Sequence, residues 1–114
     1  MNAEAVAREL GLQPLTTRAS LDREVSGGYS GDLLSDVLAH SRKGDLWVTL
    51  QAHPNIVAVG SMKELAGIII VNGRKPDAAT VQKAEEEGIP ILVTELPAFE
   101  VNGRLYALGL RGTE

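Results

Sequence analysis

The sequence has no cysteine among its 114 residues. The protein can therefore form no disulfide and has no thiolate to act as a nucleophile or a zinc ligand, and this composition is compatible with a reducing compartment. Histidine is scarce as well: His40 and His53 lie on different predicted elements and lack the close spacing of metal ligands. We therefore expect no metal site and no cofactor.

Aromatic and basic residues are also in short supply. The chain has one Trp, two Tyr and one Phe, and its formal net charge is −4. Proteins that bind nucleic acids need clustered Lys and Arg for the phosphates and aromatic rings on which bases stack. We therefore expect no nucleic-acid partner.

Long apolar runs are missing too. No run approaches the roughly 20 residues of a membrane span, and the first residues mix charged and small side chains, unlike the basic-then-apolar order of a signal peptide. We expect a cytoplasmic protein with no membrane partner. A chain of 114 residues has the size of one domain. We assign that domain to 1–114, with a core at about 22–110 that follows an amino-terminal helix and an extended lead-in over 1–21.

What the sequence does contain predicts an α/β fold. The stretch 66–71 is apolar at every position, which is typical of a strand buried on both faces of a parallel sheet. A turn at Asn72 and Gly73 leads to a helix over Ala78–Glu87 that begins after Asp77 and ends at Gly88. The remaining elements are expected as strands at 22–26, 46–50 and Ile91–Val93, and as helices at Ala3–Leu10, from Asp32 to about 43, and at 54–62. The fold class is a single α/β domain with a mostly parallel sheet of about four strands and helices on both faces.

Two stretches have alternative interpretations. The segment 56–59 is β-branched and suits a strand, but a helix is favoured because parallel neighbours need a crossover connection. The tail over 98–109 has a helical stripe opened by Pro97, whereas Asn102 and Gly103 are typical of a hairpin turn. We favour the helix here as well.

Four stretches together resemble the DRTGG domain family. The resemblance lies in their order and spacing: GGYSGDLLSDV at 27–37, GDLWVT at 44–49, IIIVNGRKPD at 68–77 and AEEEGIPIL at 84–92. Such domains occur in some phosphotransacetylases, between the CBS modules of regulatory pyrophosphatases and as stand-alone proteins, and the amino-terminal domain of HPr kinase is similar. The first stretch resembles the stand-alone branch.

The sequence departs from the signature that gives this family its name. Ala52-His53-Pro54 stands where the family has its Asp-Arg pair, and Val71-Asn72-Gly73 stands where it has Thr-Gly-Gly. The family has no established catalysis in this domain. The resemblance therefore implies a regulatory or dimer-forming module.

A ligand site is expected where the strands of the parallel sheet end, because ligands gather beyond the carboxyl ends of such strands. The candidate ligand-binding residues are Ser26, Gly27, Gly28, Tyr29, Ser30, Gln51, His53, Asn72, Gly73, Arg74 and Thr94. Backbone amides of the glycine-rich stretch 27–31, predicted as a loop before a helix, would hold an anion, with Arg74 or Lys75 adding charge. The alternative is that these glycines only form a tight turn of the backbone and bind no ligand.

The function expected from these features is a non-catalytic regulatory module. It would act by homodimerisation, bind a small anionic metabolite, either phosphorylated or a nucleotide, and relay that state to a regulatory protein partner. Trp47 or Tyr29 at an edge would suit a symmetric dimer, and the run 85–87 would be a solvated face. One alternative is a phosphoryl- or acyl-transfer enzyme using His53, Asp36 and the stretch 27–31. Another is a purely structural dimerisation domain.

Overall fold

The strand β4 (Gly67–Ile70) lies at the centre of a five-stranded sheet whose order is β1-β5-β4-β3-β2. A computed structural model describes residues 1–112. The other strands are β1 (Gln13–Pro14), β2 (Gly27–Ser30), β3 (Asp45–Thr49) and β5 (Ile91–Val93). All neighbours run parallel except β1, which pairs antiparallel with β5. The sheet is thus mostly parallel, as predicted, with one short strand more than expected.

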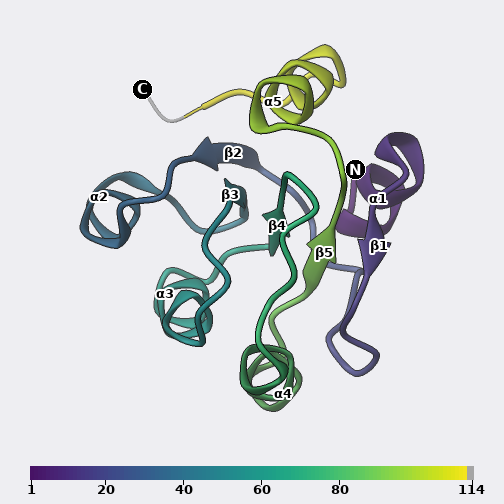
Figure 1. The fold of residues 1–114 in the computed structure, drawn as a ribbon. Coiled ribbons are helices and arrows are strands. Elements are labelled where there is room, and N and C mark those ends of the chain that lie inside the picture. Colours follow the sequence, from purple (N-terminus) through teal and green to yellow (C-terminus); the bar gives the residue numbers. More distant parts are fainter. Residues whose placement is uncertain (113–114) are drawn as a thin grey trace.

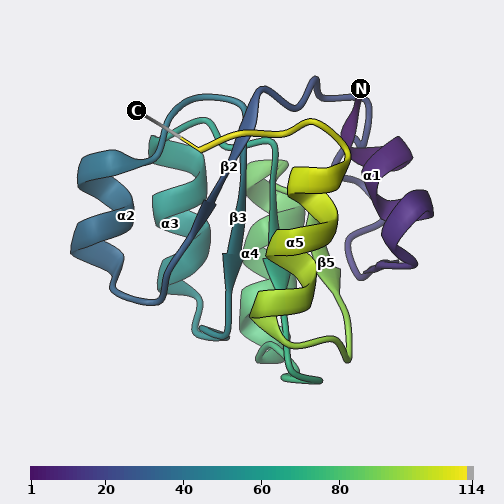
Figure 2. The same ribbon diagram turned by 90° about the horizontal axis from the view of Figure 1, so that it is seen from above.

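Helices cover both faces of this sheet (Figure 1). On one face lie α1 (Ala3–Leu10) and α5 (Ala98–Ala107), and on the other α2 (Leu34–His40), α3 (Asn55–Met62) and α4 (Ala78–Glu87). Figure 2 shows α5 lying obliquely over the sheet with α1 beside it. No helix within residues 1–112 is long and apolar enough to cross a bilayer.

Alternating side chains along the central strands divide the core into two apolar clusters. Val48 and Ile69 belong to the cluster under α1 and α5, whereas Trp47, Ile68 and Ile70 belong to the cluster under α2, α3 and α4. All five side chains are almost completely inaccessible to solvent. Burial on both faces explains why these strands read as continuous apolar runs.

Several helix ends carry residues that are typical of helix caps. The Asn2 side chain caps α1 by accepting a 2.9 Å hydrogen bond from the amide of Ala5. Gly11 and Gly88 end α1 and α4 in the left-handed conformation, with φ of 69° and 72°, where glycine is not strained. Asp77 occupies the cap position of α4 but its side chain makes no capping bond. The tail forms the helix α5, which confirms the favoured alternative.

The predictions for the β2 region are wrong in two respects. The strand expected at 22–26 lies instead at Gly27–Ser30, so the stretch predicted as a loop is a strand up to Ser30. It is extended because it pairs with β3, Gly28 opposite Leu46. The helix expected from Asp32 begins instead at Leu34 and is flanked by Leu33, so Asp32 does not cap it.

Asp32 is used instead to fix the end of β3. Its carboxylate accepts hydrogen bonds from the Thr49 hydroxyl at 2.8 Å and the Leu50 amide at 2.9 Å. A side chain that can cap a helix can equally bond backbone amides elsewhere. Asp32 could either cap α2 or bond the end of β3, and the packing of β2 beside β3 selects the second.

Two further expectations also need correction. Glu85 is not merely solvated: its carboxylate accepts hydrogen bonds from the amides of Thr17 and Arg18, both at 2.8 Å, and from the Thr17 hydroxyl at 2.7 Å. Trp47 does not lie at an edge. It is fully buried on β3, and its indole nitrogen donates a 2.8 Å hydrogen bond to the carbonyl of Gly31.

Candidate functional site

A hollow of about 470 Å³ lies where β4 and β5 end. The chain leaves β4 through Asn72 and Gly73, whose φ angles are 62° and 66°. Their amides donate to the carbonyl oxygens of Leu96 at 2.9 Å and Thr94 at 3.0 Å. The exits of the two strands are thereby tied together, and the turn holds Arg74 and Lys75 at the rim of the hollow.

The charge at this rim is mainly positive. Arg74, Lys75 and Arg104 line the hollow together with one acidic residue, Glu95, in a chain whose net charge is −4. Arg104 is paired with Glu100 through Nε and Oε2 at 3.3 Å. Within residues 1–112, the side chains of Arg74 and Lys75 make no hydrogen bond or ion pair. Two exposed cations are therefore available to an anion.

The walls of the hollow are partly apolar. Leu10 comes from the end of α1, Val93 from β5 and Leu96 from the chain beyond it. Concave sites with apolar walls and a few converging polar groups are typical of small-molecule binding. A ligand that combines an anionic group with a flat or apolar body matches this arrangement.

Three of the predicted ligand-binding residues, Gly73, Arg74 and Thr94, line this hollow, and Asn72 precedes them in the same turn. Gln51 and His53 lie at the exit of β3 and are engaged locally. Gln51 Nε2 donates to the carbonyl oxygen of Asp32 at 2.8 Å. His53 Nδ1 accepts a 3.1 Å hydrogen bond from the Asn55 amide at the start of α3. Neither residue lines the hollow.

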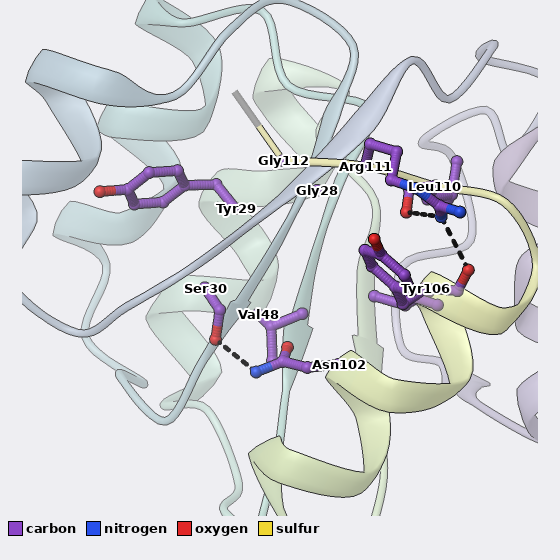
Figure 3. A pocket seen from close by; sticks show the side chains of 10 residues that line it. Gly28, Tyr29, Ser30, Val48, Asn102, Tyr106, Leu110, Arg111 and Gly112 are labelled. Carbon is purple, nitrogen blue, oxygen red and sulfur yellow. Dashed lines mark hydrogen bonds between the residues drawn. The ribbon is translucent and has the colours of Figure 1, made fainter. Parts of the chain in front are cut away.

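The five predicted residues of the β2 region are spread along the strand. Gly28, Tyr29 and Ser30 line a groove of about 150 Å³ between β2 and α5 (Figure 3). Figure 3 shows the Tyr29 ring pointing away from α5. Ser26 and Gly27 lie at the amino end of the strand, near Lys43 and away from the strand exits. A strand separates the residues that a loop would have gathered, so the predicted set does not form one site.

Tyr29, Asp36 and His40 form a hydrogen-bonded chain on the surface beside α2. The Tyr29 hydroxyl donates to Asp36, and His40 Nδ1 lies 3.1 Å from the other carboxylate oxygen. The bond from Tyr29 lowers the pKa of Asp36 and raises that of Tyr29, because it favours the ionised carboxylate and the protonated phenol. Asp36 and His40 are four residues apart, so they lie one helical turn apart on α2 and their side chains are in contact.

The hydrogen-bonded chain of Tyr29, Asp36 and His40 does not include His53, the other candidate histidine. Within residues 1–112 no hydrogen bond or ion pair joins Asp36 to His53. The same part of the chain contains no group of three or more His, Asp or Glu residues that could hold a metal ion. The residues that a phosphoryl- or acyl-transfer site would require are thus engaged separately.

Sequence reasoning missed several residues of the hollow, among them the polar residues Gln13 and Arg104. Gln13 reaches it because β1 adds antiparallel to β5, and Arg104 because α5 lies over the sheet. The helical stripe of the tail indicated that α5 is a helix but not where it packs. Lys75 was recognised as a source of charge beside Arg74.

The fold is similar to that of a solved structure, the CBS and DRTGG domains of the regulatory region of Clostridium perfringens pyrophosphatase, complexed with the activator diadenosine tetraphosphate. The TM-score is 0.67 at 14% sequence identity, over 95% of this chain and 46% of that one. This chain therefore has a DRTGG-like fold and spans less than half the length of that structure. No protein-family model matches the sequence, and no curated protein is similar to it in sequence.

Proposed function

We propose that this domain is a non-catalytic, cytoplasmic regulatory module that binds a small anionic metabolite in the hollow beside β4 and β5. It acts as a homodimer and passes the ligand-bound state to a protein partner. The observation that carries the proposal is the pair of unpartnered cations, Arg74 and Lys75, at the rim of a hollow with apolar walls.

The chemistry of these two residues favours a phosphate-bearing ligand. An arginine guanidinium presents a planar fork of donors that matches phosphate oxygens, and a lysine adds a point charge. The apolar wall formed by Leu10, Val93 and Leu96 suits the base of a nucleotide or a similar body. A nucleotide would use both features of the hollow at once.

The structural comparison supports the same proposal. The pyrophosphatase structure is that of a regulatory region, and its activator, diadenosine tetraphosphate, is an anionic dinucleotide. The fold likeness makes regulation by such a ligand a reasonable expectation here. The fold likeness does not identify which residues of this chain would contact a ligand, because only 14% of the residues are identical.

Thermal unfolding across a panel of nucleotides and acyl phosphates tests the proposal. A ligand at 100 times its Kd stabilises the folded state by about 2.7 kcal/mol, which raises the Tm of a domain of this size by several degrees. We expect such a shift for at least one nucleotide, and we expect Arg74→Ala to abolish it.

Lys83→Ala is the matched control, since it removes a cation from α4 that does not line the hollow. This variant should keep the full shift. A panel without any shift would overturn ligand binding and leave the purely structural alternative. An equal loss of the shift in both variants would show that net charge, and not the hollow, attracts the ligand.

A further inference from the structure

The helix α5 carries an exposed stripe with two aromatic side chains, one of which contacts Arg111: the Arg111 Cζ atom lies 3.7 Å from the centre of the Tyr106 ring. Phe99 is 87% exposed, the largest exposure among the large apolar side chains of residues 1–112, and Tyr106 is 60% exposed. With Asn102 they stand at positions i, i+3 and i+7, so they lie along one side of the helix. A phenyl ring exposed to water gains free energy when it is buried. The stripe is therefore a surface that gains from being covered.

The groove shown in Figure 3 lies directly beside this stripe. Asn102 and Tyr106 form its wall on α5, and Gly28 and Ser30 form its floor on β2. Asn102 Nδ2 donates a 3.0 Å hydrogen bond to the Ser30 hydroxyl, which fixes the helix against the strand. The groove measures about 150 Å³, a volume that holds a benzene ring in an apolar cavity. It is large enough for one aromatic side chain.

We propose that a second copy of this chain covers the stripe, with the two α5 helices antiparallel and each Phe99 ring seated in the groove of the other copy. The inference rests on the self-association in the proposed function and names the surface that produces it. Phe99 and Tyr106 are seven residues apart, which is about 10.5 Å along a helix. A two-fold axis between residues 102 and 103 places Phe99 of each copy opposite Tyr106 of the partner copy.

The small residue at the axis allows the two helices to approach closely. Gly103 lies between Phe99 and Tyr106, and a Cβ added to it would meet nothing within 4 Å. Such a contact is isologous, because the same surface is used by both copies, and it closes at a dimer. A heterologous contact would instead leave one ring uncovered at one end of the assembly and one groove unfilled at the other.

The charges of α5 select the antiparallel orientation. Glu100 and Arg104 are exposed and paired within the helix through Nε and Oε2 at 3.3 Å. About the same two-fold axis, Glu100 of one copy faces the region of Arg104 in the partner copy, so opposite charges meet. A parallel pair would place like charges opposite each other, which is destabilising.

The oligomeric state of the whole chain, measured by light scattering or sedimentation over a concentration series, tests this surface. We expect a dimer whose Kd rises tenfold or more in Phe99→Gln, the loss expected of a buried aromatic anchor. Met62→Gln is the control: Met62 is 71% exposed on α3, which lies on the other face of the sheet. Its Kd should be unchanged.

The outcomes separate this inference from the proposed function. A stable dimer that Phe99→Gln does not weaken overturns the α5 surface and leaves self-association intact. A wild-type chain that stays monomeric at every concentration overturns both self-association and the surface. Ligand binding is tested separately, by the thermal shift with nucleotides and its loss in Arg74→Ala.

A cysteine crosslink tests the orientation, since the chain has no cysteine of its own. Gly103→Cys places a thiol beside the axis in each copy, and mild oxidation should join the two chains. Ala107→Cys places the two thiols about 13 Å apart along the helices, beyond the roughly 7 Å between Cα atoms that a disulfide spans, and should not crosslink. Equal crosslinking of both variants would indicate parallel helices and overturn the proposed geometry.

Discussion

The centre and the edges of the sheet are held by different forces. The β4 strand at the centre has three consecutive isoleucines, 68–70, all fully buried. The edge strand β2 reads Gly-Gly-Tyr-Ser and is only partly buried. It is fixed on its outer side by the carbonyl oxygen of Arg111, which accepts a 3.2 Å hydrogen bond from the Gly28 amide. At the other edge, the chain that follows β1 is fixed by the carboxylate of Glu85.

The difference lies in which part of the chain supplies the stability. The centre is stabilised by apolar side chains, and these belong to the central strands themselves. At the edges, backbone amides are satisfied by partners that lie far away in the sequence, 83 residues in the case of Gly28 and Arg111. Substitutions should therefore act through cavities at the centre and through lost or blocked backbone contacts at the edges.

The largest effect is expected at the centre. Ile69→Ala removes a fully buried side chain from β4 and leaves a cavity, which should lower the free energy of unfolding by about 2 to 5 kcal/mol. Urea denaturation measures it. Met62→Ala, at a position 71% exposed, should change stability by no more than about 0.5 kcal/mol. A similar loss in both variants would contradict an apolar centre.

A smaller effect is expected at the β2 edge. A Cβ on Gly27 would lie 2.5 Å from the carbonyl oxygen of Arg111, so Gly27→Ala must displace the carboxyl-terminal segment. We expect a loss of about 1 to 3 kcal/mol, as for overpacking, measured by the same denaturation. The control is Gly28→Ala, whose Cβ would meet only the carbonyl oxygen of Leu46 at 3.6 Å.

Gly27→Ala and Gly28→Ala replace the same residue type in the same strand, so helix or strand propensity cannot account for a difference between them. Removing residues 111–114 should abolish most of the difference, because the blocking oxygen is then gone. If Gly28→Ala proved as destabilising as Gly27→Ala, the contact with Arg111 would not be what restricts position 27.

The same contrast explains which elements could be predicted. The strand around Ile69 and the helix ending at Gly88 carry their signals within a few residues, as apolar runs and as a left-handed terminator. The strand state of Gly28 has no local signal, because it arises from pairing with Leu46 and from the carbonyl of Arg111. Adjacent glycines in isolation indicate a turn. Only the tertiary structure makes them a strand.

The residues of the candidate site also fall into a group that could be predicted from the sequence and a group that could not. Gly73, Arg74 and Thr94 were predicted because the ends of neighbouring parallel strands lie at one edge of the sheet. That rule requires only the order of the strands. Arg104 and Gln13 line the same hollow through the packing of α5 and the antiparallel pairing of β1, which the sequence pattern does not specify. The position of an added edge strand or an outer helix depends on contacts along the whole chain.

The smallest effect is expected at the β1 edge, and it should depend on pH. Hydrogen bonds from Thr17 and Arg18 lower the pKa of Glu85 from its ordinary 4.5 to about 2. Because the pKa is lower in the folded protein, the ionised carboxylate stabilises the fold above about pH 4.5, and this stabilisation is lost as the pH falls toward 2. Glu85→Gln should weaken the amide protection of Thr17 and Arg18 in hydrogen exchange at neutral pH. It should also make the free energy of unfolding fall less steeply on acidification.

Glu86→Gln is the control, because it removes an exposed neighbouring carboxylate, and it should have neither effect. Equal acid sensitivity of wild type and Glu85→Gln would show that other carboxylates, and not the bonds to Glu85, govern the stability of the fold in acid.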